Sequence, residues 1–338
     1  MKGRNFGILR IPGENYQMHQ SKRYFGDSAG AINPMIGSNA PIGQYESIVN
    51  LLVNSTPVEF CQNTLLSLHS STGLPWWATI ILVTSGLRTI LTLPLALYQQ
   101  YIFAKVANLK CEMDEIVKEL KLETNRAVDI FGWSETYARS VYNRSLKKQW
   151  DKLIVRENCH PMKGLILVVV QIPIWITLSA SLRNLCFMLP RPTLAAHETF
   201  VQLSTEGFGW ITDLTAVDSY YILPVLLGII NLTNIEIQTL MKPKSLNQTT
   251  LPQKIGKNIF RGISIMMVPI ACMVPSCLSL YWVTSSAYGL VQSFIVVSPR
   301  IRRFVRIPET EMELKQPYKH FHDNVKEKYA WIYSNKLT

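Results

Sequence analysis

The chain has 338 residues, of which 48% are hydrophobic, and its formal net charge at pH 7 is +11. Its mean hydropathy of +0.11 suits a protein with several membrane spans and sizeable polar loops better than a soluble domain. The basic residues lie beside apolar stretches, where lipid headgroups and membrane topology account for them, so nucleic-acid recognition is at most an accessory role.

Residues 1–45 are predicted to be a mitochondrial targeting presequence followed by a linker. Residues 1–30 carry five Lys/Arg, two acidic residues and no apolar core, which excludes an ordinary secretory signal. The alternative is a basic tail without a targeting role. Residues 30–45 are rich in Gly, Pro, Ala and Asn, as is typical of a linker.

Residues 46–72 mix apolar and polar residues and are predicted to form an amphipathic segment along the membrane surface. Residues 73–298 are predicted to form the membrane core. Its first three spans are residues 74–97, 164–182 and 220–240, each near the length of about 20 residues that a hydrocarbon core of about 30 Å requires.

The last apolar tract, residues 263–297, would make a helix of roughly 50 Å, too long for one crossing. Pro275 followed by Ser276 is the expected hinge, because proline lacks an amide donor and restricts the residue before it. The tract then provides two short spans. The expected fold is an all-α membrane protein with a bundle of five transmembrane helices.

Loop charges predict the orientation. Residues 99–162, 241–262 and 298–338 hold eleven, five and nine Lys/Arg, whereas residues 183–219 hold two Lys/Arg and four acids. The three basic segments fall on one side of a five-span arrangement, so that side is predicted to be the matrix or cytoplasm. The N-terminal side then faces the intermembrane space, and residues 299–338 form a short basic matrix tail.

Loop 99–162 is predicted to form an antiparallel helical hairpin on the matrix side. Its first helix has an apolar seam at spacings of four and three: Ile102, Val106, Leu109, Met113, Ile116 and Leu120. A turn near residues 129–132 leads to a second helix, residues 133–155, with a less regular seam: Tyr137, Val141, Leu146, Trp150 and Leu153. The alternative is that the stripe packs on the protein's own membrane surface.

Arg88 lies in the middle of the first span. A guanidinium stays protonated, and placing it at the centre of a bilayer costs about 2.5 to 3.5 kcal/mol, so it requires polar neighbours. Asn231 and Asn234 share one face of the third span, and Gln238 extends that line by a turn. The predicted substrate groove consists of Arg88, Gln171, Asn231, Asn234, Gln238 and Trp282. The alternative is ordinary packing polarity between helices.

Glu236 and the cysteines are the other candidate groups. Glu236 lies nearer the basic side and is expected to pair with a loop cation, with a role as proton carrier as the alternative. The six cysteines form no Cys-x-x-Cys pair and no cluster with zinc spacing, so most are expected to be free thiols. Cys61 and Cys186 are expected on the same side of the membrane, and a disulfide between them is an alternative to two free thiols.

Catalytic motifs are absent from the sequence. No histidine falls inside a predicted span, and there is no Gly-x-Ser-x-Gly, His-Glu-x-x-His or phosphate-binding loop. The sequence therefore predicts no enzyme, no metal site and no cofactor.

Four segments in order resemble the YidC/Oxa/Alb membrane-insertase family, over about residues 70–298. They are GLPWWATIILVTSGLRTILTLPLALYQQ (73–100), QIPIWITLSASLRN (171–184), TDLTAVDSYYILPVLLGIIN (212–231) and VPSCLSLYWVTSSAYGLVQ (274–292). One departure is Pro275-Ser276-Cys277, where many members have Pro-Ala-Gly. The resemblance implies that Arg88 is the groove arginine and that the hairpin handles substrate on the matrix side.

Residues 154–164, IVRENCHPMKG, resemble the branch dedicated to cytochrome c oxidase assembly. That resemblance implies a substrate, the hydrophilic C-terminal tail of cytochrome c oxidase subunit II, moved out across the mitochondrial inner membrane. Complex IV assembly factors and membrane lipids are the implied partners, without nucleic-acid specificity. The alternatives are a general insertase of mitochondrially encoded proteins, a small-solute transporter or channel with Arg88 as an anion site, and a passive holdase.

Overall fold

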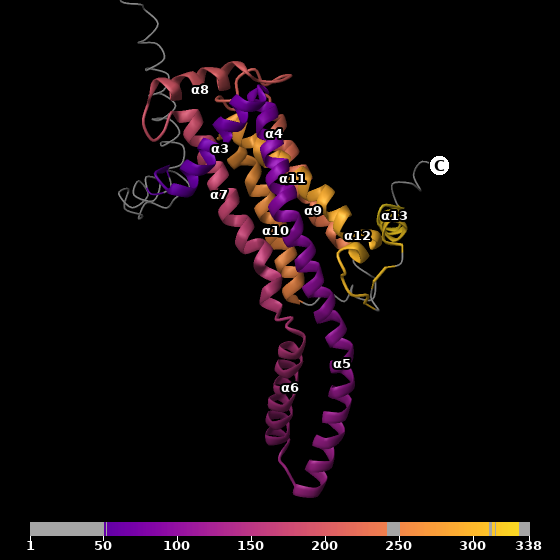
Figure 1. Cartoon of the computed structure of the whole chain (residues 1–338). Coiled ribbons are helices and arrows are strands. Elements are labelled where there is room, and N and C mark those ends of the chain that lie inside the picture. Colours follow the sequence, from indigo (N-terminus) through magenta and orange to yellow (C-terminus); the bar gives the residue numbers. More distant parts are fainter. Residues whose placement is uncertain (1–50, 52, 242–250, 311–312, 315, 331–338) are drawn as a thin grey trace, which may run out of the picture. The chain divides into compact units, whose positions relative to one another are not determined.

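The structure is a computed structural model that describes residue 51 and residues 53–241, 251–310, 313–314 and 316–330 (Figure 1). The predicted presequence and linker lie outside the described residues. Within them, the regular elements are helices, and the one extended pairing is the isolated bridge between Phe208 and Ile211. The expected all-α class is confirmed. The helices are α3 (Thr56–Thr72), α4 (Trp76–Leu87), η1 (Arg88–Thr92), α5 (Leu93–Phe131), α6 (Glu135–Glu157), η2 (Pro161–Leu165), α7 (Ile166–Phe187), α8 (Leu194–Thr205), α9 (Ile222–Leu240), α10 (Leu251–Ala271), α11 (Ser276–Val297), α12 (Pro299–Phe304) and α13 (Pro317–Lys328).

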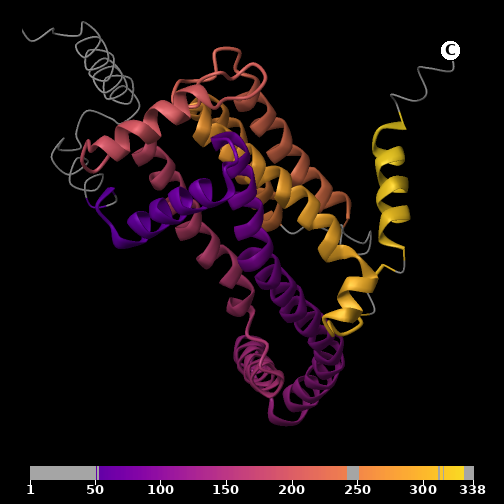
Figure 2. The ribbon, with the colours of Figure 1, turned by 45° about the horizontal axis from the view of Figure 1, so that its top comes forward.

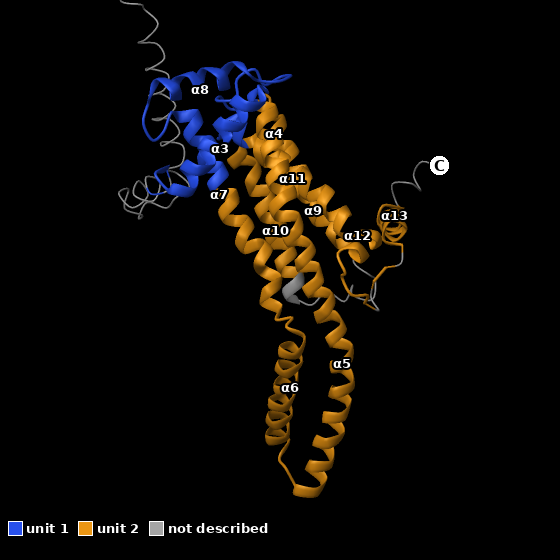
Figure 3. Cartoon of the chain, viewed as in Figure 1, with its two compact units in different colours: residues 1–76, 177–217, 273–278 blue, residues 77–176, 218–272, 279–338 orange. Residues whose placement is uncertain are grey.

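Figure 3 shows the chain divided into two compact units. Unit 1 contains residues 1–76, 177–217 and 273–278, and unit 2 contains residues 77–176, 218–272 and 279–338. Each unit therefore combines three stretches that are far apart in the sequence.

In unit 1, α3 packs on the last turns of α7. The buried Ser181 hydroxyl donates to Val58 O at 2.9 Å, and the buried Asn184 amide donates to Val53 O at 3.2 Å. These bonds satisfy the Ser181 hydroxyl and the amide nitrogen of Asn184, which would otherwise be costly to bury. The amphipathic segment predicted at residues 46–72 is therefore helical from Thr56, although residues 46–50 and 52 lie outside the described part. Its position along the membrane surface stays a prediction.

The segment that connects the second and third predicted spans, residues 183–219, is helical for part of its length. Helix α7 continues to Phe187, five residues beyond the expected end of the second span, and α8 follows. The reason is packing within unit 1, because Leu185, Leu203 and Leu214 are buried there.

In the part of the chain that the structure describes, four helices are long and apolar enough to cross a membrane: Trp76–Phe131 (α4, η1 and α5 as one run), Pro161–Phe187, Ile222–Leu240 and Ser276–Val297. Their apolar side chains also face outward, as Ile90, Val169 and Ile229 show with 72%, 65% and 56% exposure. A helix that is apolar on its outer as well as its inner face suits a lipid environment.

The expected hinge in the last apolar tract is confirmed, because α10 ends at Ala271 and α11 begins at Ser276. Helix α10, the expected fourth span, is not among the four candidates. It carries Lys254, Lys257 and Arg261 within its first half. The count of five spans therefore stays a prediction. In unit 2, α10 packs closely on α9, where a Cβ on Gly228 would lie 2.5 Å from Val268 Cγ2.

The hairpin is confirmed: α5 and α6 run side by side in opposite directions (Figures 1 and 2). Gly132 ends α5 in the left-handed region at φ 60°, and the Ser134 hydroxyl caps α6. The predicted seam forms the core between the helices: Leu109, Met113 and Leu153 with Cys159, flanked by Val106, Ile116, Leu146 and Trp150. The prediction is wrong for Tyr137, which is 55% exposed near the turn.

The tail after α11 contains helices α12 and α13 and contacts α9 and α11 within unit 2. The Asn324 amide donates to Leu240 O of α9 at 2.8 Å, and the Tyr318 hydroxyl donates to Phe294 O of α11 at 3.1 Å. Sequence reasoning anticipated the charge of this tail but not its helices.

Candidate functional site: a hydrogen-bonded arginine in the membrane bundle

Arg88 opens the short π-helical segment η1 between α4 and α5. The Leu93 amide donates to Arg88 O, five residues back, and the Thr92 hydroxyl donates to the same oxygen at 2.9 Å. Such wide turns inside α-helices occur often at functional positions. The segment places a permanent cation on the first span.

The Arg88 guanidinium is held by two neutral side chains. Its Nε and Nη2 donate to Ser285 Oγ of α11 at 3.1 and 2.5 Å. Gln171 of α7, with its amide oxygen toward the guanidinium, accepts from Nη1 and Nη2 at 3.2 and 3.3 Å. Helices α4/α5, α7 and α11 therefore meet around one cation in unit 2.

No ion pair between described residues includes Arg88, so no described carboxylate lies within 4.0 Å of it. The guanidinium is half-buried. A cation with only neutral partners keeps its full charge for an approaching anion or carbonyl group.

The structure brings some of the predicted groove residues together and leaves others apart. Arg88 and Gln171 are in contact. Asn234 donates instead to Ser286 O of α11 at 3.0 Å, and its Oδ1 is buried without a hydrogen-bond partner. Asn231 is half-buried, whereas Gln238 is exposed.

Trp282 is 6% exposed and stacks on Trp175 of α7, with ring centroids 5.5 Å apart. It therefore fills the contact between α7 and α11. Ser285, one helical turn after Trp282 on the same face of α11, is the hydrogen-bond partner of Arg88 that sequence reasoning did not place in the groove. Residue spacing places Ser285 on the same face as Trp282, but it does not show that this face meets Arg88.

A second polar contact lies beside Arg88. The Thr89 hydroxyl is 2.8 Å from the Tyr288 hydroxyl of α11, and either can donate. Thr89 and Tyr288 follow Arg88 and Ser285 by one and three positions. They extend the polar contact between α11 and the first span beyond the guanidinium.

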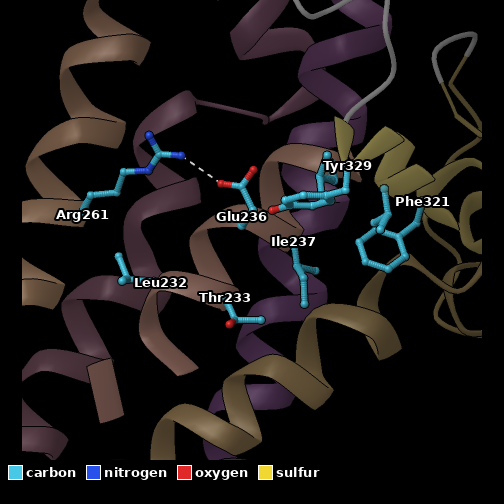
Figure 4. A pocket seen from close by; sticks show the side chains of 9 residues that line it. Leu232, Thr233, Glu236, Ile237, Arg261, Phe321 and Tyr329 are labelled. Atoms are coloured by element: carbon cyan, nitrogen blue, oxygen red, sulfur yellow. Dashed lines mark hydrogen bonds and ion pairs between the residues drawn. The ribbon is translucent and has the colours of Figure 1, made fainter. Parts of the chain in front are cut away.

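Glu236 of α9 forms a different charged cluster in unit 2. Arg261 Nη2 of α10 donates to its Oε2 at 2.9 Å, and Lys328 of α13 contacts its Oε1. The expected pairing of Glu236 with a loop cation is confirmed. A hollow of about 500 Å³ adjoins it (Figure 4). Its lining is mostly apolar: Leu232, Thr233, Glu236, Ile237, Leu240, Arg261, Phe321, Val325 and Tyr329.

Within the described residues, no three His, Cys, Asp or Glu side chains gather in a way that could hold a metal ion. The polar groups around Arg88 are hydroxyls and amides, which are poor nucleophiles without an adjacent base. The arrangement offers hydrogen-bond donors and acceptors to a polar group.

The comparisons with known proteins identify the family of the chain. The family model described as 60Kd inner membrane protein matches residues 67–303. The mitochondrial cytochrome c oxidase assembly protein COX18 of Mus musculus is 42% identical over 288 residues, which cover 84% of this chain and 83% of that protein. Its Homo sapiens counterpart is 43% identical over 301 residues, covering 86% and 84%.

The mitochondrial inner membrane protein OXA1 of Arabidopsis thaliana is 27% identical over 255 residues, which cover 75% of this chain and 52% of that protein. The family model spans well over half of the chain, and both COX18 proteins named above align over most of their own length. The chain therefore belongs to the 60Kd inner membrane protein family, the YidC/Oxa/Alb membrane insertases.

Proposed function

We propose that this protein is an insertase of the mitochondrial inner membrane that moves hydrophilic segments of client proteins across the bilayer during cytochrome c oxidase assembly. Its family membership supports the insertase class. Relatives named as mitochondrial cytochrome c oxidase assembly proteins support the compartment and the pathway. The proposed client is the C-terminal tail of cytochrome c oxidase subunit II, which complex IV assembly factors then receive.

The observation that carries this proposal is the partner set of Arg88. A guanidinium has five N–H donors. Ser285 and Gln171 together accept four hydrogen bonds from the guanidinium of Arg88. With respect to the described residues, one donor is left for a carbonyl or carboxylate group of the client. The two neutral partners can exchange with such a group without leaving a buried carboxylate unpaired.

In this mechanism the polar residues around Arg88 form a groove open to the matrix and to lipid. A hydrophilic tail that enters it loses less hydration than it would in bare lipid. The apolar helix of the client then leaves sideways into the bilayer, driven by its own burial. The protein needs no cofactor for these steps.

The proposed orientation places the N-terminal side in the intermembrane space and the C-terminus in the matrix. The membrane potential then favours export of negative charge by about 2.3 kcal/mol per charge per 100 mV. A cation at position 88 attracts the same acidic groups, so the two effects act in one direction.

Arg88 variants test the proposal. Protease protection of the subunit II tail in isolated mitochondria measures its export. We expect Arg88→Leu to reduce export at least about tenfold, which corresponds to about 1.4 kcal/mol. Arg88→Lys retains the charge but not the planar fork, so it should lie between Arg88→Leu and the wild type.

Arg183→Leu is the matched control, because Arg183 belongs to unit 1 and contacts the Phe187 ring instead of the Arg88 cluster. Wild-type export by an Arg88→Leu protein present at normal level would show that the cation is dispensable. A tail that binds yet stays on the matrix side in the wild type would indicate a passive holdase.

A general insertase of mitochondrially encoded proteins is the second candidate, favoured by the similarity to the OXA1 protein. Loss of this protein would then impair the insertion of many newly made membrane proteins. The proposed function predicts a defect confined to cytochrome c oxidase. Labelling of mitochondrial translation products in depleted cells, followed by membrane extraction, separates the two.

A further inference from the structure

Two buried thiols face each other in unit 1. Cys186 lies in the last turn of α7, and Cys277 lies in the first turn of α11, ninety-one positions later. Their sulfur atoms are 3.0 Å apart, and the residues are 3% and 0% exposed. The six cysteines are unbonded in the structure, so this contact is one between two thiols.

The backbone holds both cysteines in place. The Cys277 amide donates to Leu214 O at 3.0 Å, and the Ser276 amide donates to Ala216 O at 2.7 Å. On α7, the Asn184 side chain is bonded to Val53 O. The two sulfur atoms therefore meet because their helix ends are anchored, and they are not brought together by a flexible loop.

We infer that Cys186 and Cys277 are a disulfide-forming pair that ties the end of α7 to the hinge between α10 and α11. A disulfide bond is about 2.05 Å long, so the sulfurs need to approach by only about 1 Å, which small side-chain rotations provide. The bond closes a loop that contains α8, α9 and α10. Closing so long a loop restricts the unfolded chain more than it restricts the folded one.

The redox step is a thiol–disulfide exchange. A disulfide of a protein oxidant or of oxidised glutathione accepts two electrons, and the two cysteine thiols give up two protons as their sulfurs join. The oxidant becomes two thiols, so atoms and electrons balance. Because the two thiols are buried once unit 1 is folded, an oxidant reaches them while the unit folds.

The side of the membrane favours this chemistry. The proposed orientation places residues 183–219 and the hinge at residues 272–275 on the side away from the basic segments. That side is the intermembrane space, which is separated from the reduced thiol pool of the matrix. The two cysteines of the hairpin, Cys111 and Cys159, lie on the matrix side in the same arrangement and are expected to stay reduced.

The structure also changes the pairing that the sequence left open. Cys61, the expected neighbour of Cys186, lies in unit 1 but contacts the Ser181 hydroxyl. Cys186 faces Cys277 instead. Cys61→Ser is therefore a matched control that removes a thiol from the same unit and leaves the proposed pair intact.

The test counts free thiols in full-length protein from isolated mitochondria. The organelles are quenched with acid, dissolved in detergent under denaturing conditions and treated with a maleimide polymer that adds mass to each free thiol. One half of each sample is reduced first. With six cysteines in the chain, the proposal expects four polymer additions without reduction and six after it.

In Cys186→Ser and in Cys277→Ser, the five remaining thiols should all be labelled without reduction, whereas Cys61→Ser should gain two labels on reduction. Labelling of all six wild-type thiols without reduction would overturn the proposal. It would show that Cys186 and Cys277 are in contact as two reduced thiols. Loss of the reduction-dependent labels in Cys61→Ser but not in Cys277→Ser would overturn it as well. The thiol count does not depend on export, so its failure leaves the insertase proposal untouched.

Discussion

Arg88 and Glu236 both lie on apolar spans of unit 2, and their surroundings differ in one respect. Among the described residues, Arg88 donates only to neutral atoms of Ser285 and Gln171. Glu236 is contacted by two cations, Arg261 and Lys328, which reach it from α10 and α13. Its side chain is 18% exposed, whereas the Arg261 and Lys328 side chains are 40% and 43% exposed.

We therefore expect Arg88 to bind a polar group of the client, whereas Glu236 holds helices of this protein together. In surroundings of low dielectric, an opposite charge a few ångströms away cancels most of the field of a buried ion. Glu236 is cancelled in this way, and its partners connect three helices. The dipoles of Ser285 and Gln171 solvate the Arg88 guanidinium but do not neutralise its charge. We therefore expect its electric field to act on a polar group of the client.

The largest expected effect comes from giving Arg88 the kind of partner that Glu236 has. Ser285→Asp places a carboxylate where the serine hydroxyl accepts from Nε and Nη2. The resulting ion pair should lower export of the subunit II tail about as strongly as Arg88→Leu, roughly tenfold, with the protein level unchanged. Protease protection of the tail measures the effect.

Ser285→Asn is the matched control, because it has the size of the aspartate and no charge. Its export should stay within a few-fold of the wild type. If Ser285→Asp and Ser285→Asn export equally well, the uncancelled field of Arg88 does not matter and the comparison fails.

A middle-sized effect is expected from removing the carboxylate that fastens α13. In Glu236→Gln, Arg261 and Lys328 lose the negative charge between them and repel each other. We expect the free energy that holds α13 against α9 to fall by about 1 to 2 kcal/mol. This lies between the contributions of exposed and of fully buried ion pairs. Trypsin should then cleave faster at Lys319 and Lys326, whereas export of the tail should change little.

Glu123→Gln serves as the control for this variant, since Glu123 is an exposed carboxylate on the hairpin. It should leave cleavage at Lys319 and Lys326 unchanged. A wild-type cleavage pattern in Glu236→Gln, or an export defect as deep as that of Arg88→Leu, would show that the two charges do not have separate roles.

The sequence predicted what depends on local pattern. The seam of Leu109 and Met113 follows from helical periodicity, and the break before Ser276 follows from the chemistry of Pro275. The pairing of Glu236 with a cation follows from the cost of burying an unpaired carboxylate. Each of these inferences needs only one helix and its immediate chain neighbours.

The sequence did not predict which helix faces which. Ser285 meets Arg88 and Cys277 meets Cys186 because of how distant helices are aligned, and residue spacing within one helix does not encode that alignment. The same limit explains why Gln238 was placed in the site although it is exposed. Its spacing from Asn231 and Asn234 defines a face of α9 but not the partner of that face.

The smallest expected effect comes from a carboxylate outside the spans. Arg156 of α6 donates to both oxygens of Glu112 of α5, at 2.9 and 2.6 Å. This hydrogen bonding lowers the pKa of Glu112 from its usual 4.5. Because the folded state depresses this pKa, the pair stabilises the hairpin above pH 4.5, and the contribution is lost as the pH falls through the lowered pKa.

Glu112→Gln should therefore speed hydrogen exchange slightly in the facing turns of α5 and α6 at pH 7, and the difference from the wild type should fade below pH 4.5. Glu135→Gln is the control, since its partner Arg139 is on the same helix and the pair does not join α5 to α6. An effect of Glu112→Gln larger than that of Glu236→Gln on α13 would contradict the comparison. Water screens an exposed ion pair, so the pair of Arg156 and Glu112 on the hairpin should stabilise the fold less than the pair of Arg261 and Glu236 beside the spans.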